Sequence, residues 1–126
     1  RPTVLGCPDQ KILSTQVEIF GPVMSVLRFD AEDEAVNMAN DTEFGLGAGI
    51  FTNDVARVHR VSKAIRSGIV WVNTYRAVSP IAPFGGFGLS GSGREAGVDA
   101  IHEFTTTKTI WINTSAEPMV NPFTMR

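Results

Sequence analysis

Short apolar runs and helical repeats of apolar positions alternate along residues 23–73. Runs rich in β-branched and apolar residues at 23–29, 46–51 and 69–73 predict three strands, the first of them largely buried. Apolar positions at helical spacing predict one helix from Asp30 to about Asn40 and a second helix that ends before Gly68. Because the order strand, helix, strand, helix, strand with short connections favours parallel pairing and right-handed crossovers, we expect a parallel β-α-β-α-β unit of the three-layer α/β class.

The residues that flank these helices fit helix ends. We expect Asp30 to cap the first helix, whose first turn holds three acidic residues where the helix macrodipole favours negative charge. Thr52 or Asn53 can cap the second helix in the same way. Gly68 is a residue type that commonly follows a helix end. Each helix therefore has a start signal of its own in the sequence.

A different pattern begins after Asn73. Prolines and closely spaced glycines predict a long irregular loop, and loops of this length inside a compact unit are usually functional. We expect a short helix over 94–102 and then a β-prone strand over 105–113, which has no neighbouring strand in the sequence. Such a strand must pair with a distant strand of this chain or of another, so it favours a role in assembly. The tail, 115–126, is expected to be poorly ordered or to wrap over a neighbour.

Composition narrows the class of protein. The chain has 126 residues, of which 43% are apolar, enough for a domain with a core. A formal charge of −2 gives no basic surface for nucleic acid or an anionic membrane, and no apolar run has the length of a membrane span. One cysteine excludes an internal disulfide and fits the cytoplasm. The first residues include no initiator methionine and lead directly into a β-prone stretch, so we expect a piece of a longer polypeptide.

Several motifs that suggest chemistry have unsuitable contexts. The glycines of 86–91 match G-x-G-x-x-G, but a Pro-Phe loop precedes them and no acid ends the next strand, so a structural loop is favoured over a dinucleotide fingerprint. Cys7 lies in a turn composition without a nearby histidine to activate a thiolate. The two histidines and Cys7 have unrelated contexts and predict no metal site. Ser90 and Ser92 do not occupy a nucleophile elbow. We therefore predict no catalytic residue in this chain.

The segment Glu18-Ile19-Phe20-Gly21-Pro22 is the strongest candidate binding motif. In an extended backbone Glu18 and Phe20 leave the same face, and the Gly-Pro pair favours a turn after them. A carboxylate can accept hydrogen bonds from two ribose hydroxyls while an adjacent ring packs against a planar heterocycle, as a nicotinamide riboside requires. The alternative is an exposed glutamate beside a core phenylalanine.

Three motifs in order resemble the C-terminal part of the NAD(P)-dependent aldehyde dehydrogenase superfamily. They are residues 18–22, the strand 68–73, and the loop 83–95 with its Pro-Phe-Gly-Gly and Ser-Gly-Ser-Gly-Arg-Glu sequences; the closing Thr107-Lys108-Thr109-Ile110 also fits. The resemblance covers nearly the whole chain and about a quarter of such an enzyme. It implies an oxidoreductase that converts an aldehyde to a carboxylic acid with NAD or NADP through a cysteine thiohemiacetal and a thioester.

The resemblance also implies where this chain meets the ligands. The nucleophilic cysteine and the general-base glutamate of the family lie upstream, Cys7 does not match the nucleophile, and we expect the chain alone to be inactive. Glu18 resembles the acid that holds the nicotinamide ribose, Phe20 the aromatic residue beside the nicotinamide, and Leu46 a residue near the nicotinamide end. In the family one loop lines the aldehyde pocket. The residues of this chain that resemble it are Tyr75, Val78 and Phe84.

The resemblance finally implies a division of the chain. Residues 1–103 correspond to the end of the catalytic domain, and residues 104–126 to an oligomerisation strand and tail of a homo-oligomer, a dimer or a tetramer. Two other hypotheses remain open at this point. The chain could be a non-catalytic assembly module that uses the Thr-rich strand, or an autonomous dinucleotide binder that uses the Gly-rich loop.

Overall fold

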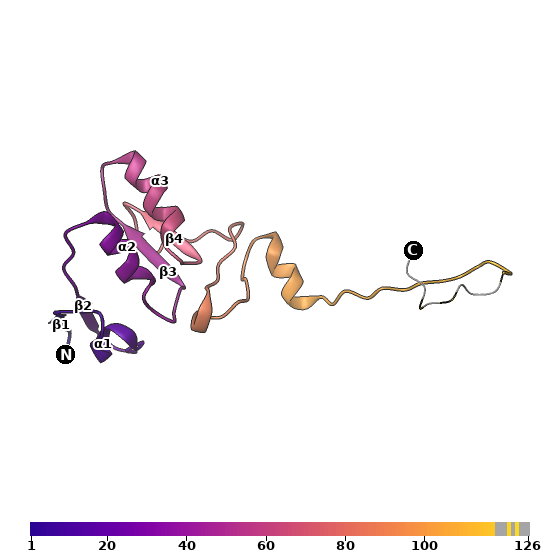
Figure 1. Ribbon diagram of the computed structural model, residues 1–126, viewed down its shortest axis with the longest axis horizontal. Coiled ribbons are helices and arrows are strands. Elements are labelled where there is room, and N and C mark those ends of the chain that lie inside the picture. Colours follow the sequence, from indigo (N-terminus) through magenta and orange to yellow (C-terminus); the bar gives the residue numbers. More distant parts are fainter. Residues whose placement is uncertain (118–120, 122, 124–126) are drawn as a thin grey trace.

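A computed structural model of the chain describes residues 1–117, 121 and 123. Over these residues the chain forms four short strands, three α-helices and two 3-10 helices (Figure 1). In chain order they are β1 (Thr3–Gly6), α1 (Leu13–Gln16), β2 (Val23–Val26), α2 (Glu32–Asn40), β3 (Gly47–Ile50), α3 (Val55–Ala64), β4 (Ile69–Val72), η1 (Gly88–Ser90) and η2 (Val98–Phe104). The fold is therefore of the α/β class that the sequence predicts.

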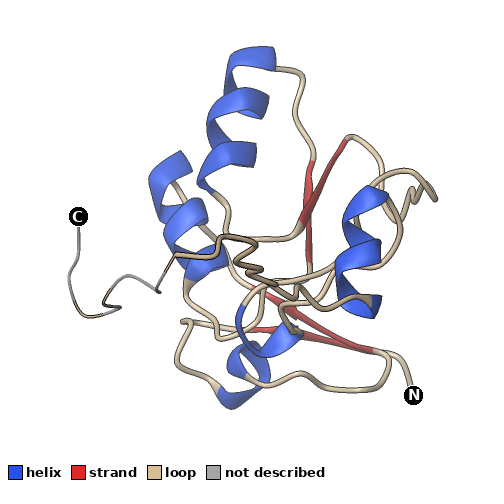
Figure 2. Ribbon diagram, turned by 90° about the vertical axis from the view of Figure 1, so that its right-hand side faces the viewer, coloured by secondary structure: helices blue, strands red, loops and turns tan. Residues whose placement is uncertain are grey.

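The four strands form two parallel pairs, which Figure 2 shows in red. β3 pairs with β4 in parallel, with Gly47 opposite Ile69, and α3 makes the crossover between them as predicted. β2 pairs in parallel with β1, with Thr3 opposite Val23, and has no ladder with β3 among the described strands. The β-prone start of the chain thus provides the partner of β2. Sequence analysis did not assign this start as a strand.

Both predicted helices form, but their caps differ from the expected ones. Ala31, not Asp30, is the N-cap of α2, because the Glu34 carboxylate reaches back and accepts hydrogen bonds from the backbone N–H groups of Asp30 (2.9 Å) and Ala31 (3.4 Å). Asp54 caps α3 by accepting a hydrogen bond from the Arg57 N–H at 3.0 Å, in place of Thr52 or Asn53. In both cases an acid side chain accepts hydrogen bonds from backbone N–H groups near the start of the helix.

The helix expected over 94–102 begins later and is a 3-10 helix, η2. Glu95 forms an isolated antiparallel bridge with Phe84, with two backbone hydrogen bonds of 2.7 Å. Ala96 and Gly97 then adopt positive φ angles of 57° and 63°. Because neither a bridge nor a left-handed backbone is compatible with a right-handed helix, the helix cannot begin before Val98.

The β-prone segment 105–113 is not a strand in this structure. Figure 1 shows it as part of an extended arm that leads away from the rest of the chain after η2, and no described strand pairs with it. The side chains of Ile110, Trp111 and Ile112 are 68%, 92% and 78% exposed. Of the two partners that the sequence leaves open, a strand of this chain is not found among the described residues, whereas pairing with another chain stays a prediction. Most of the expected poorly ordered tail, 118–120, 122 and 124–126, lies outside the described residues.

The chain buries little apolar surface. Among the large apolar side chains that the structure describes, Ile50 alone is buried, at 8% exposure. The accessible surface is 10544 Å², whereas a compact monomer of 13.6 kDa has about 6,600 Å². No helix within the described ranges is long and apolar enough to cross a membrane.

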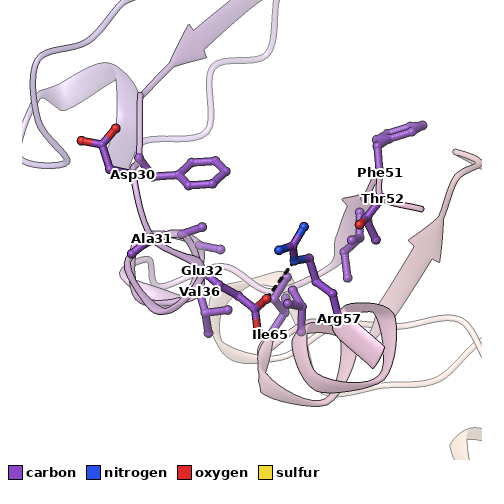
Figure 3. A pocket seen from close by; sticks show the side chains of 14 residues that line it. Asp30, Ala31, Glu32, Val36, Phe51, Thr52, Arg57 and Ile65 are labelled. Atoms are coloured by element: carbon purple, nitrogen blue, oxygen red, sulfur yellow. Dashed lines mark hydrogen bonds and ion pairs between the residues drawn. The ribbon is translucent and has the colours of Figure 1, made fainter. Parts of the chain in front are cut away.

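A hollow of about 410 Å³, the Glu32 hollow, lies between α2, α3 and β3 (Figure 3). Apolar side chains such as Val36 and Ile65 line most of it, and none of the predicted site residues does. At its edge the Glu32 carboxylate accepts hydrogen bonds of 2.9 Å from Arg57 and, in a bidentate pair, from Arg60. These contacts join the two helices. The hydrogen bonds from Arg60 and Arg57 lower the pKa of Glu32 from 4.5 to about 2, and Glu32 raises the pKa of Arg60.

We expect Glu32→Gln to lower the melting temperature of the protein at pH 7, since it removes the carboxylate shared by two arginines. A depressed pKa stabilises the fold above pH 4.5, and this contribution is lost as the pH falls through about 2. The difference in melting temperature between wild type and Glu32→Gln should therefore shrink below pH 4.5. Asp33→Asn is the control, because it removes a charge from the same helix turn without an ion pair. Equal effects of both variants at pH 7 would contradict the role of the pair.

Candidate cofactor and substrate site

Glu18 and Leu46, far apart in the sequence, line one hollow of about 380 Å³, the Glu18 hollow. Glu18 comes from the segment between α1 and β2, and Leu46 directly precedes β3. The Glu18 side chain is exposed, and no hydrogen bond to its carboxylate is found within the described part of the chain. Arg66, at the end of the α3 crossover, lines the same hollow and donates a hydrogen bond to the Thr42 carbonyl. The hollow thus combines an acceptor carboxylate with an apolar wall.

Phe20 does not share this hollow with Glu18. Its side chain is 93% exposed, the largest exposure of any described phenylalanine. Two tight turns hold the backbone around it, because the Gly21 N–H donates to the Ile19 carbonyl and the Val23 N–H donates to the Gly21 carbonyl, both at 2.8 Å. The ring therefore lies on the surface, open to a ligand or to further protein.

Phe84 lines a second hollow of about 340 Å³, the Phe84 hollow, together with Leu46 and the Gly-rich loop. Its backbone is fixed by the bridge to Glu95 described above. Leu46 and Ser90 line both the Glu18 hollow and the Phe84 hollow. These two residues therefore form a wall with one hollow on each side.

Tyr75 and Val78, the other predicted pocket residues, lie apart from both hollows. The Tyr75 ring contacts the Trp71 ring edge to face, with centroids 5.2 Å apart, and the Trp71 indole N–H donates to the Ala77 carbonyl at 2.7 Å. Tyr75 and Val78 remain 64% and 74% exposed. The structure thus anchors the loop after β4 on Trp71 and leaves both predicted side chains facing outward.

The backbone of Gly45 connects the strand starts to the Gly-rich loop. Sequence analysis did not identify this role. The Gly45 carbonyl accepts hydrogen bonds from the N–H groups of Gly68 (3.0 Å) and Phe87 (3.1 Å), and the Gly45 N–H donates to the Ser90 hydroxyl at 3.1 Å. The starts of β3 and β4 and the Gly-rich loop therefore meet at one buried residue. The sequence signal was the glycine itself, since a Cβ at this position would lie 2.8 Å from the Arg66 carbonyl oxygen.

Arg94 holds the Gly-rich loop in shape. Its Nη1 donates to the carbonyls of Gly86 and Gly93, both at 2.9 Å, and its guanidinium lies 5.2 Å from the centroid of the Phe87 ring. The G-x-G-x-x-G glycines lead into η1, which has three residues, and not into an α-helix. This geometry agrees with a structural loop and lacks the helix N-terminus that a dinucleotide fingerprint needs.

Cys7 and the histidines lie outside both hollows. The Cys7 sulfur contacts the Ser14 hydroxyl at 3.8 Å and the Leu5 carbonyl oxygen at 3.7 Å. Within the described ranges no three His, Cys, Asp or Glu side chains come together in a group that could hold a metal ion. The Glu18 hollow can therefore offer a carboxylate, the Arg66 guanidinium, apolar walls and backbone groups.

The fold is α/β with two parallel strand pairs, and a Gly-rich loop docks at the starts of β3 and β4. Comparison with known proteins shows the family. Residues 1–110 match the model of the aldehyde dehydrogenase family. The chain belongs to this family, which confirms the resemblance of its motifs.

Individual relatives agree with this assignment. The chain is 55% identical over 126 residues to a (Z)-2-((N-methylformamido)methylene)-5-hydroxybutyrolactone dehydrogenase of Acinetobacter baylyi, covering 99% of this chain and 26% of the relative. It is 46% identical to aldehyde dehydrogenase 1A1 of Bos taurus over 91% of this chain and 23% of the relative. A structure of the P. syringae indole-3-acetaldehyde dehydrogenase AldA, a mutant in complex with NAD+ and IAA, is similar with a TM-score of 0.82 and 43% identity, covering 88% and 22% of the two chains. The chain thus spans about a quarter of the length of these relatives.

We expect Gly68→Ala to displace the Gly-rich loop, because a Cβ at Gly68 would lie 1.7 Å from the carbonyl oxygen of Gly85. Overpacking of this kind costs about 1–3 kcal/mol of stability. Thermal or urea unfolding of the protein measures the cost. Gly6→Ala is the matched control, since a Cβ at Gly6 in β1 meets no atom within 4 Å. Equal stability of the two variants would show that the loop does not pack on β4 as described.

Proposed function

We propose that this chain is part of an enzyme that oxidises an aldehyde to a carboxylic acid with NAD or NADP, and that it forms one wall of the cofactor and substrate cleft. The observation that carries the proposal is the meeting of Glu18 and Leu46 in one hollow that borders the Phe84 hollow. A cofactor ribose in the first hollow and an aldehyde in the second would lie on the two sides of the Leu46 wall. Because hydride transfer requires direct contact between the nicotinamide ring and the substrate carbon, the two ligands would have to meet at an open edge of this wall.

The residues of the Glu18 hollow fit a nicotinamide riboside. The two carboxylate oxygens of Glu18 can accept hydrogen bonds from two neighbouring ribose hydroxyls, and no described group competes for them. Leu46 offers an apolar surface, and the open Phe20 ring can pack against a planar heterocycle from the outside. The bound cofactor supplies a hydride acceptor. The NAD+ complex of the P. syringae relative supports the same ligand class here.

The aldehyde side of the cleft is assigned to Phe84, Tyr75 and Val78. Phe84 is held beside Leu46, whereas Tyr75 and Val78 face outward from the loop after β4 and can line a pocket whose opposite wall comes from further protein. Cys7 is not the nucleophile of this proposal, because it lies outside both hollows. The chain alone is therefore expected to be inactive, with the nucleophile and general base on other sequence.

The extended arm supports a role in assembly. We assign residues 1–103 to the catalytic domain and residues 104–126 to an oligomerisation segment, on the exposure of Ile110, Trp111 and Ile112 and the absence of a partner strand among the described residues. Such an apolar extended segment can add to the sheet of a second copy of the protein. We infer a cytoplasmic homo-oligomer. A non-catalytic assembly module is the alternative that the same arm supports.

Glu18→Gln in the full-length enzyme tests the proposal. We expect the KM and the dissociation constant for NAD+ or NADP+ to rise about tenfold or more, because a hydrogen bond to a charged acceptor is weakened, while the KM for the aldehyde changes little. Steady-state kinetics and a cofactor titration followed by fluorescence measure these constants.

The matched control is Asp33→Asn, which removes a carboxylate charge from an exposed side chain outside both hollows. Its cofactor constants should equal those of wild type. Unchanged cofactor constants in Glu18→Gln would exclude Glu18 from the cofactor site. A full-length protein without aldehyde-oxidising activity would instead favour the assembly module.

A further inference from the structure

The wall between the two hollows contains two side chains, Leu46 and Ser90, and they come from different parts of the chain. Leu46 directly precedes β3, and Ser90 ends η1 in the Gly-rich loop. The position of the wall therefore depends on how the Gly-rich loop docks against the turn before β3. Any group that fixes this docking also fixes the separation of the Glu18 hollow from the Phe84 hollow.

Three hydrogen bonds dock the loop on this turn. Two are between backbones: the Phe87 N–H donates to the Gly45 carbonyl at 3.1 Å, and the Leu89 N–H donates to the Glu43 carbonyl at 2.8 Å. The third runs from the Gly45 N–H to the Ser90 hydroxyl oxygen at 3.1 Å. Across residues 1–117 it is the one hydrogen bond between loop and turn that a side chain makes, so it is the one that a substitution can remove.

The bond from Gly45 to Ser90 is partly buried. Gly45 is buried and Ser90 is half-buried, so a Gly45 N–H without this acceptor has little access to water. A buried donor without a partner is costly, and the local backbone must then move to find one. Gly45 immediately precedes Leu46, so such a movement shifts the Leu46 side chain. Ser90 also packs closely on the loop, because a Cβ at Gly86 would lie 2.7 Å from the Ser90 Cβ.

We propose that Ser90 is a positioning residue that sets the Leu46 wall and thereby couples the cofactor site to the aldehyde site. The proposal rests on the function assigned above to the two hollows. Ser90 acts through its hydroxyl, which accepts the Gly45 N–H and holds the turn against the loop. Loss of the hydroxyl shifts a wall that both ligands touch, so cofactor and aldehyde binding weaken together.

The test is Ser90→Ala in the full-length enzyme. We expect the KM for NAD+ and the KM for propionaldehyde and benzaldehyde, used as probe aldehydes, to rise together by about threefold to tenfold, the range that corresponds to one lost hydrogen bond. The value of kcat should change less than either KM, since Ser90 contacts no reacting atom in this account. The dissociation constant for NAD+, measured without aldehyde, should rise by the same factor as its KM.

Hydrogen exchange gives a second measurement that does not depend on activity. The amide of Gly45 donates to Ser90, so the peptide that contains Gly45 should exchange faster in Ser90→Ala by mass spectrometry. Ser92→Ala is the matched control: it removes a hydroxyl from the same loop, two residues away, at an exposed side chain for which no side-chain hydrogen bond is found over residues 1–117. Its constants and its exchange should equal those of wild type.

The outcomes separate this inference from the proposed function. A coupled rise of both KM values with faster exchange at Gly45 supports the role of Ser90. An active wild-type enzyme in which Ser90→Ala changes one KM alone, or neither, overturns the inference and leaves the proposed function intact. Failure of the wild-type full-length protein to oxidise aldehydes or bind NAD+ overturns the proposed function on which the inference rests.

Discussion

Burial is the constraint on which the rest of this structure depends. The chain exposes about 4,000 Å² more than a compact protein of its mass, which is the size of a large obligate interface. Parallel strands are normally covered on both faces, yet here they occur as two separate pairs. Pairs of this kind have marginal stability by themselves. We propose that further protein covers the apolar Glu32 hollow and the open strand edges.

The candidate site follows from the same constraint. Every ligand-facing side chain proposed for this chain lies on an open surface. Glu18 and Leu46 line one hollow, Leu46 and Phe84 line a second, and Phe20, Tyr75 and Val78 are exposed outside both hollows. What the chain does fix internally is the backbone around Gly45, where two strand starts and the Gly-rich loop meet. The chain thus fixes the backbone beneath the proposed site, whose opposite wall and nucleophile we propose lie on other sequence.

Features that depend on local sequence were predictable, and features that depend on distant contacts were not. The periodicity of apolar residues predicted α2, α3, β3 and β4, because a short segment contains the whole signal. The predicted cap of α2 was wrong because the Glu34 carboxylate, a few residues away, accepts hydrogen bonds from the backbone at the helix start. The β1–β2 pair and the wall of Leu46 and Ser90 join residues far apart in sequence, and no pattern within one segment encodes them. The segment 105–113 has strand propensity but no partner in the chain, and propensity alone does not form a ladder.

The central claim is that further protein covers and stabilises the strands of this chain. The most direct test compares hydrogen exchange of β2, β3 and β4 in the isolated chain of residues 1–126 and in the full-length protein. If the chain is one wall of a larger protein, these strand amides are protected in the full-length enzyme and exchange orders of magnitude faster in the isolated chain, because the covering surface is lost. Equal protection in both samples would show that the chain is stable by itself and would contradict the account.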